Sequence, residues 1–171
     1  MIKKAAPQTA REFPSSPLNY KDSVLIVTGG RSPVDENASY YKSVDMYDIC
    51  KNRWSEGPEM NAARVMHNTC LLGDSTIYAF GGIKNAAQEM QEGIEKLNVS
   101  HLLLGKTGVC WEVIAVRPAS GIPLRINFLC APVGPSDMIV LGGMNNDEIF
   151  GDAFVFNGEG NQVSNTRRND V

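Results

Sequence analysis

Short apolar runs that stop at paired glycines recur three times along the chain. They read "VLIVTGG" at residues 24–30, "TIYAFGG" at 76–82 and "MIVLGG" at 138–143, so the double glycines recur after 52 and then 61 residues. Short runs rich in β-branched and aromatic residues are typical of strands. These runs lack alternation of apolar and polar positions, which predicts strands that are covered on both faces.

A second, shorter apolar segment follows each double glycine after a polar loop. These segments span residues 43–48, 94–98 and 152–157. In the first unit Trp54 stands seven residues after Tyr47, and in the second unit Trp111 follows a longer connection. A repeat of about 50 residues with four short strands is typical of small sheets arranged radially around an axis.

The first unit resembles the kelch repeat, whose unit is one four-stranded blade of a β-propeller. The resemblance is carried by Gly29 and Gly30, by "YDICKNRW" at residues 47–54 and by "MNAAR" at residues 60–64. The later units depart from the pattern, because Leu97 replaces the tyrosine and Val163 replaces the tryptophan. The resemblance covers about residues 24–163 and implies an all-β fold. About three kelch-type blades, each a four-stranded antiparallel sheet, would form an incomplete propeller ring.

Three parts of the chain are expected. Residues 1–20 form a flexible N-terminal segment, residues 21–163 form the kelch-repeat domain, and residues 164–171 form a polar C-terminal tail. The blades span about residues 21–60, 61–117 and 122–163. The first blade lacks an obvious inner strand, because residues 1–20 hold three prolines and little apolar pattern.

Three blades do not close a ring, since propellers typically use four to eight. Open sheet edges carry unpaired hydrogen-bonding groups that attract other strands. Three explanations stay open. The chain is part of a longer propeller protein or a truncated relative of one, or it pairs with itself or a partner to complete a ring, or it stands alone as an open arc.

The repeated motif residues are interpreted as structural. Glycine tolerates positive φ and close backbone approach, which a strand end needs where neighbouring blades crowd together. Tyr47 and Trp54 are expected to pack against each other and across to the next blade, so truncating Trp54 should cost about 3–5 kcal/mol. The structural set comprises Gly29, Gly30, Tyr47, Trp54, Gly81, Gly82, Trp111, Gly142 and Gly143.

Composition and charge narrow the classes of partner. The chain has 171 residues, 43% of them hydrophobic and 20% charged, which is the usual mix of one soluble domain. The net charge of −3 argues against nucleic acid, and no run approaches the roughly 18 apolar residues that cross a membrane. Without a secretory signal at the N-terminus, the four cysteines are expected to be free thiols in a reducing, cytoplasmic compartment.

Catalytic and metal-binding signals are weak. The chain has two histidines, and His67 and Cys70 would face opposite sides of a strand, so they would not share a metal. We therefore expect no cofactor, no metal, no catalytic residue and no small-molecule substrate. The competing interpretation is an enzyme built on a kelch-like propeller, such as a sugar isomerase or an oxidase, although copper oxidases of this kind need several tyrosine and histidine ligands.

The loops between second and third strands should emerge on one face of the blades, where binding residues are commonly found. The resemblance places the residue after the double glycine and the arginine before the first strand on a partner-binding face. The candidate residues are Arg31, Tyr40, Tyr41, Arg64, Glu89 and Asp147. We expect a protein–protein interaction scaffold or adaptor that binds another protein, or a second copy that completes the propeller. The resemblance also allows the substrate-recognition part of a ubiquitin-ligase adaptor, or an actin binder.

Overall fold

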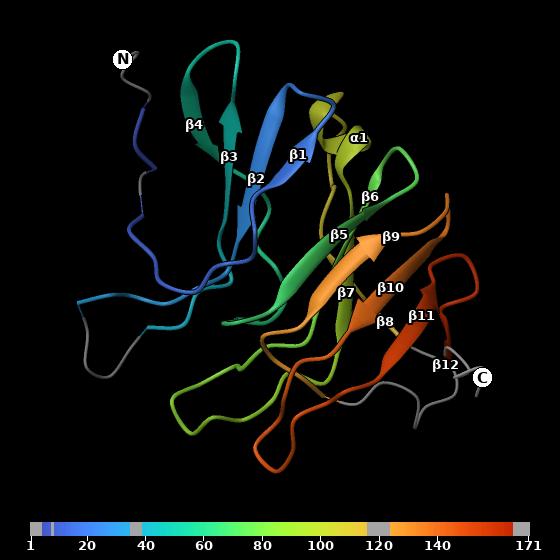
Figure 1. The fold of residues 1–171 in the computed structure, drawn as a ribbon. Helices are drawn as coiled ribbons and strands as arrows, with labels where there is room; N and C mark the ends of the chain where they lie inside the picture. Colours follow the sequence, from blue (N-terminus) through green and yellow to red (C-terminus); the bar gives the residue numbers. More distant parts are fainter. Residues whose placement is uncertain (1–4, 8, 35–38, 116–123, 166–171) are drawn as a thin grey trace.

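Three four-stranded antiparallel sheets make up the chain in a computed structural model that describes residues 5–7, 9–34, 39–115 and 124–165 (Figure 1). The predicted all-β fold of three kelch-type blades is confirmed. Residues 166–171, most of the predicted polar tail, lie outside the described residues. Among the described residues, no helix has the length and apolar character needed to cross a membrane.

Each sheet runs in sequence order from an inner strand to an outer strand. The first sheet holds β1 (Leu18–Tyr20), β2 (Val24–Thr28), β3 (Val44–Asp48) and β4 (Arg53–Glu56). The second holds β5 (Asn68–Leu72), β6 (Thr76–Phe80), β7 (Ile94–Asn98) and β8 (Glu112–Ile114), with the short helix α1 (Val99–Leu103) inserted before β8. The third holds β9 (Leu129–Pro132), β10 (Asp137–Leu141), β11 (Ala153–Asn157) and β12 (Gln162–Asn165).

The first sheet has an inner strand that the sequence pattern did not reveal. β1 pairs antiparallel with β2, with Leu18 opposite Ile26 and Tyr20 opposite Val24. It is three residues long and begins directly after Pro17, so no apolar pattern of useful length marks it. The first blade therefore begins within residues 1–20, the segment predicted to be a flexible N-terminal part of the chain.

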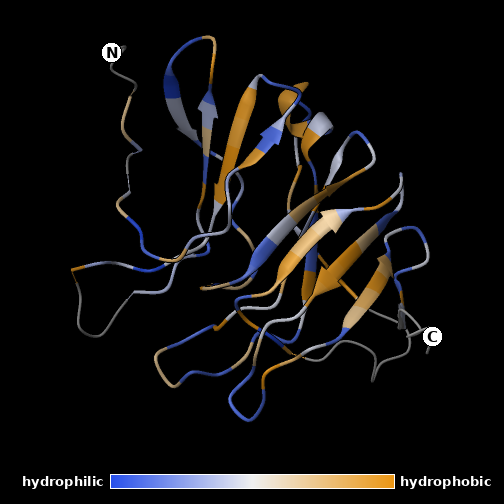
Figure 2. Cartoon of the chain, in the orientation of Figure 1, coloured by the Kyte–Doolittle hydropathy of each residue, from blue (hydrophilic) through white to orange (hydrophobic). Residues whose placement is uncertain are grey.

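Two apolar cores hold the three sheets together, one at each junction between neighbouring blades. Successive residues of β6 point to opposite sides, so Ile77 and Ala79 pack toward the first sheet while Tyr78 and Phe80 pack toward the third. This arrangement explains why the run before Gly81 lacks alternation, since both of its faces are covered. In Figure 2 the strands carry most of the apolar residues, and the connecting loops are mainly hydrophilic.

Candidate functional site

Arg64 lies at the junction between the first and second blades and is completely buried. Its side chain is 0% exposed, and its Nη2 lies 3.1 Å from a Glu95 carboxylate oxygen. The same guanidinium donates hydrogen bonds to the carbonyl oxygens of Gly81 (2.9 Å) and Gly93 (2.5 Å). The prediction that Arg64 contacts a partner is wrong, because its guanidinium is engaged inside the protein and out of reach of a partner.

The same set of contacts is present in all three blades, and we call it the arginine clamp. Each clamp joins an arginine before the first strand to the carbonyl of the first paired glycine and to a carboxylate near the start of the third strand. Arg11 donates to Gly29 (2.6 Å) and Asp45 (2.6 Å), and Arg125 donates to Gly142 (2.7 Å) and Asp152 (3.0 Å). Together with Arg64, these residues fasten the beginning of each blade to its own second and third strands.

Sequence reasoning singled out Arg64 but neither Arg11 nor Arg125, and it predicted no clamp. For Arg11 a signal was present in the sequence. The available signal was the Ala-Arg pair at residues 10–11, which matches the Ala-Arg pair at 63–64. Arg64 stands four residues before β5, whereas Arg11 stands seven residues before β1. The longer connection, which includes Pro14 and Pro17, hid the correspondence.

The paired glycines allow successive blades to approach closely. A Cβ on Gly81, which has φ +59, would collide with the Arg125 carbonyl oxygen and lie 2.8 Å from the Phe128 ring. A Cβ on Gly29 would meet the Arg64 carbonyl oxygen and lie 2.6 Å from His67 Cε1. Both glycines are therefore required by the positive φ and by the contact with the next blade.

Buried His67 packs at the junction between the first two blades. Its Nε2 lies 2.7 Å from Thr28 Oγ1, in the first blade. Burial, reinforced by the positive charge of Arg64, lowers the pKa of His67 to about 3. The imidazole is therefore neutral near pH 7 and acts as a packing and hydrogen-bonding group.

A neutral buried His67 predicts that the protein loses stability on mild acidification. In the unfolded chain the pKa is close to the ordinary 6.5, against about 3 in the folded state. The unfolded state therefore binds an extra proton below pH 6.5, and the free energy of unfolding falls by up to about 1.4 kcal/mol per pH unit. Urea denaturation between pH 7 and pH 5 measures this fall.

The matched variant for this measurement is His67→Phe, because Phe128 fills the equivalent place in the next junction. The variant lacks the titrating imidazole, so the His67 contribution to the slope disappears over the same range. A wild-type profile as flat as that of His67→Phe would contradict the neutral buried histidine.

The aromatic motif residues occupy two different environments. Tyr47 and Trp54 are directly opposite on β3 and β4, and their ring centroids lie 5.1 Å apart, so the two rings pack against each other as expected. Trp54 is only half-buried, and its Nε1 donates to the Ala5 carbonyl at 3.0 Å. The expectation that Trp54 packs across to the next blade is wrong, because its side of the sheet faces away from the second blade. Trp111 fills that role in the core between the first two sheets.

The predicted loop residues of the first blade gather around the N-terminal segment. Arg31 forms an ion pair with Glu12 (3.1 Å) and lies over the Phe13 ring, and it also forms an isolated bridge with Tyr40. Tyr41 lies beneath the guanidinium of Arg11. Arg31, Tyr40 and Tyr41 are all partly exposed.

Glu89 and Asp147 lie on the corresponding loops of the second and third blades, which run on the same side of the sheets as the first loop (Figure 1). Glu89 pairs with Lys84 at 3.0 Å, and this hydrogen-bonded contact lowers the pKa of Glu89. Asn145 orders the third loop by accepting hydrogen bonds from the backbone N–H groups of Asp147 and Glu148. These contacts of Glu89 and Asp147 lie within their own loops.

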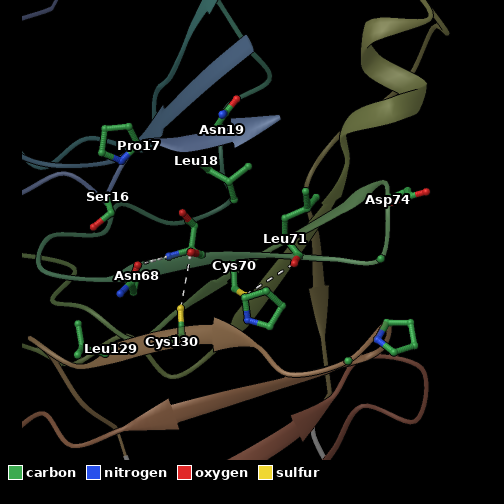
Figure 3. A pocket seen from close by; sticks show the side chains of 15 residues that line it. Ser16, Pro17, Leu18, Asn19, Asn68, Cys70, Leu71, Asp74, Leu129 and Cys130 are labelled. Atoms are coloured by element: carbon green, nitrogen blue, oxygen red, sulfur yellow. Dashed lines mark hydrogen bonds between the residues drawn. The ribbon is translucent and has the colours of Figure 1, made fainter. Parts of the chain in front are cut away.

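An open cavity of about 850 Å³ lies along the inner strands of the three blades (Figure 3). Two thiols line it: Cys70 on β5 and Cys130 on the adjacent β9. The contact between them lowers the pKa of the Cys70 thiol, and this contact together with burial raises the pKa of Cys130. No group of three or more His, Cys, Asp and Glu side chains suited to a metal ion is found among the described residues.

Comparison with known proteins agrees with this architecture. A kelch motif matches residues 20–61, which corresponds to the first blade. The mouse protein Kelch-like protein 8 is 32% identical over 79 residues, which is 46% of this chain. The aligned region is 12% of the length of that relative, so this chain corresponds to a small part of it. The motif match identifies the first blade as a kelch repeat, and the three four-stranded sheets with their repeated double glycines are consistent with incomplete kelch propeller blades.

Proposed function

We propose that the chain is a protein-interaction module that binds a partner protein through the loops after β2, β6 and β10. The observation that carries the proposal is the position of these loops on one side of three packed sheets (Figure 1). Loops held by a rigid scaffold are common binding sites. Kelch repeats in general serve as interaction scaffolds, and we propose no catalytic role.

We call the surface formed by the loops after β2, β6 and β10 the loop face. Its side chains favour a partner segment that carries both basic and apolar groups. Ile149 is 82% exposed, and the neighbouring Met144 is also exposed. Asp147 and Glu148, next to Ile149 in the third loop, are exposed carboxylates, and the second loop carries a further exposed carboxylate at Glu92. Apolar contact supplies affinity at such a surface, and charge complementarity steers the approach and selects the partner.

Arg31, Tyr40, Tyr41, Glu89 and Asp147 remain in the proposed binding face. Adaptor and scaffold roles in the cytoplasm are part of the proposal. So are two narrower roles, substrate recognition for a ubiquitin ligase and binding to actin. A second copy of the chain is a further proposed partner, and it would use the two open ends of the arc in place of the loops.

Replacing Ile149 tests the loop face. Ile149→Asp should weaken capture of partner proteins from a cell lysate by about tenfold or more, because it removes an exposed apolar anchor and adds a like charge to the carboxylates. Leu104→Asp is the matched control, since Leu104 is 75% exposed beyond α1, far from these loops. Quantitative mass spectrometry of the captured proteins gives the comparison. Equal capture by both variants and by the wild type counts against this face.

A further inference from the structure

The third blade leaves open the face that the first two blades bury. Leu141 is the last residue of β10 before a double glycine and corresponds to Thr28 and Phe80 in the other blades. Thr28 and Phe80 are 1% and 2% exposed, whereas Leu141 is 40% exposed. Leu129, which pairs with Leu141 on the same face, is 68% exposed. An apolar sheet face that is covered in the other two blades is therefore uncovered in the third.

Backbone groups at this open end repeat those that join the blades elsewhere. At the two existing junctions, the N–H of the second paired glycine donates to the arginine carbonyl of the next clamp: Gly30 to Arg64 at 2.8 Å, and Gly82 to Arg125 at 3.1 Å. Gly143 offers the equivalent N–H group. No residue in the described part of the chain accepts from it.

A second series of hydrogen bonds runs from blade to blade beside the inner strands. Met66 N–H donates to the Phe13 carbonyl at 3.2 Å, and Asn127 N–H donates to the Met66 carbonyl at 3.3 Å. The Asn127 carbonyl is the next acceptor in this series. It has no donor within the described ranges.

The first blade carries the groups that the third blade lacks. The Arg11 carbonyl corresponds to those of Arg64 and Arg125, and the Phe13 N–H corresponds to that of Met66. Neither group has a hydrogen-bond partner among the residues that the structure describes. The third blade thus has a donor and an acceptor without partners among the described residues, and the first blade has the acceptor and the donor that match them.

The outer face of the first blade is only partly covered along its second strand. Leu25 and Val27 of β2 are only partly buried there, whereas the equivalent Ile77 and Ala79 of β6 are fully buried by a neighbouring blade. Residues 5–7 lie on this face, where the Ala5 carbonyl accepts from a tryptophan Nε1 as the Pro58 carbonyl does in the second blade. Residues 5–7 therefore take the place of a connector between blades, and no sheet formed by the described residues packs on this face.

We propose that two copies of this chain join head to tail, with the third blade of each copy packed on the first blade of the other. Six is the only multiple of three within the four to eight blades that close a propeller, so two copies complete one ring. In each new junction Gly143 N–H donates to the Arg11 carbonyl, and Phe13 N–H donates to the Asn127 carbonyl. These are the contacts through which a second copy of the chain, proposed above as a partner, would bind. They lie apart from the loops proposed to bind a partner protein.

Molar mass in solution tests this ring. Light scattering on the 171-residue chain should give twice the 18.6 kDa of one copy. Leu141→Asp and Leu129→Asp should each return the mass to that of one copy, because each places a charge in the proposed interface. Circular dichroism checks that each variant folds. If Leu141→Asp does not fold, Leu129→Asp still tests the interface, because Leu129 is the more exposed of the two side chains.

Two controls separate this interface from other surfaces. Leu104→Asp and Ile149→Asp should both keep the doubled mass, even where Ile149→Asp has lost capture of a partner protein. A wild-type mass of one copy, or one above two copies, overturns the closed ring. If Leu141→Asp and Leu129→Asp both fold and both keep the doubled mass, the proposed contacts are overturned.

Discussion

Arg64→Met is expected to lower the free energy of unfolding by about 3–5 kcal/mol, because it leaves the Glu95 carboxylate buried without its counter-ion. Glu95 is 1% exposed, and its other partners are groups of Asn61 and Ala62, which do not neutralise its charge. The variant also removes donors from the Gly81 and Gly93 carbonyls at the end of β6 and the start of β7. Urea denaturation followed by circular dichroism measures the change.

Arg31→Met is the matched control for this prediction. Arg31 also forms an ion pair at 3.1 Å, with Glu12, but its side chain is 35% exposed. Exposed ion pairs contribute about 0–1 kcal/mol, since water screens the charges. Equal losses in the two variants would show that the buried clamp is no more important than a surface pair.

Trp111→Ala is expected to cost about 3–5 kcal/mol, which is the usual range for removing a buried aromatic side chain. Trp111 is 3% exposed in the core between the first two blades, and its Nε1 donates to the Pro58 carbonyl at 2.9 Å. Trp54 is the internal comparison, because it donates the equivalent hydrogen bond to Ala5 while remaining half-buried.

Trp54→Ala should cost roughly half as much as Trp111→Ala, because less apolar area is removed from contact. The two variants share the same substitution and the same type of lost hydrogen bond. The difference between their free energies of unfolding therefore isolates burial between blades. A larger loss for Trp54→Ala would contradict this assignment of the junction core.

The sequence predicts the parts of the fold that depend on local pattern. The three apolar runs before double glycines become β2, β6 and β10, and the seven-residue spacing of Tyr47 and Trp54 gives a directly paired contact across β3 and β4. These features depend on short spacings and on the special conformations of glycine, so they are visible in a single chain.

Burial of a charged side chain is not visible in the same way. Arg31 and Arg64 are both arginines at motif positions, yet one is partly exposed and the other is enclosed. The difference arises because Glu95, 31 residues from Arg64, comes to the same place only after the second blade has folded. The clamp formed by Arg11 and Asp45 was missed for the same reason, since its partners are 34 residues apart.

Amide hydrogen exchange at the paired glycines tests most directly the claim that each blade is fastened to the next through the second glycine. Because Gly30 and Gly82 donate to the Arg64 and Arg125 carbonyls, their amides should exchange at least about a hundredfold more slowly than in an unstructured peptide. Exchange resolved by NMR gives both rates in one experiment. If both amides instead exchange at the rate of an unstructured peptide, the blades are not joined in this way.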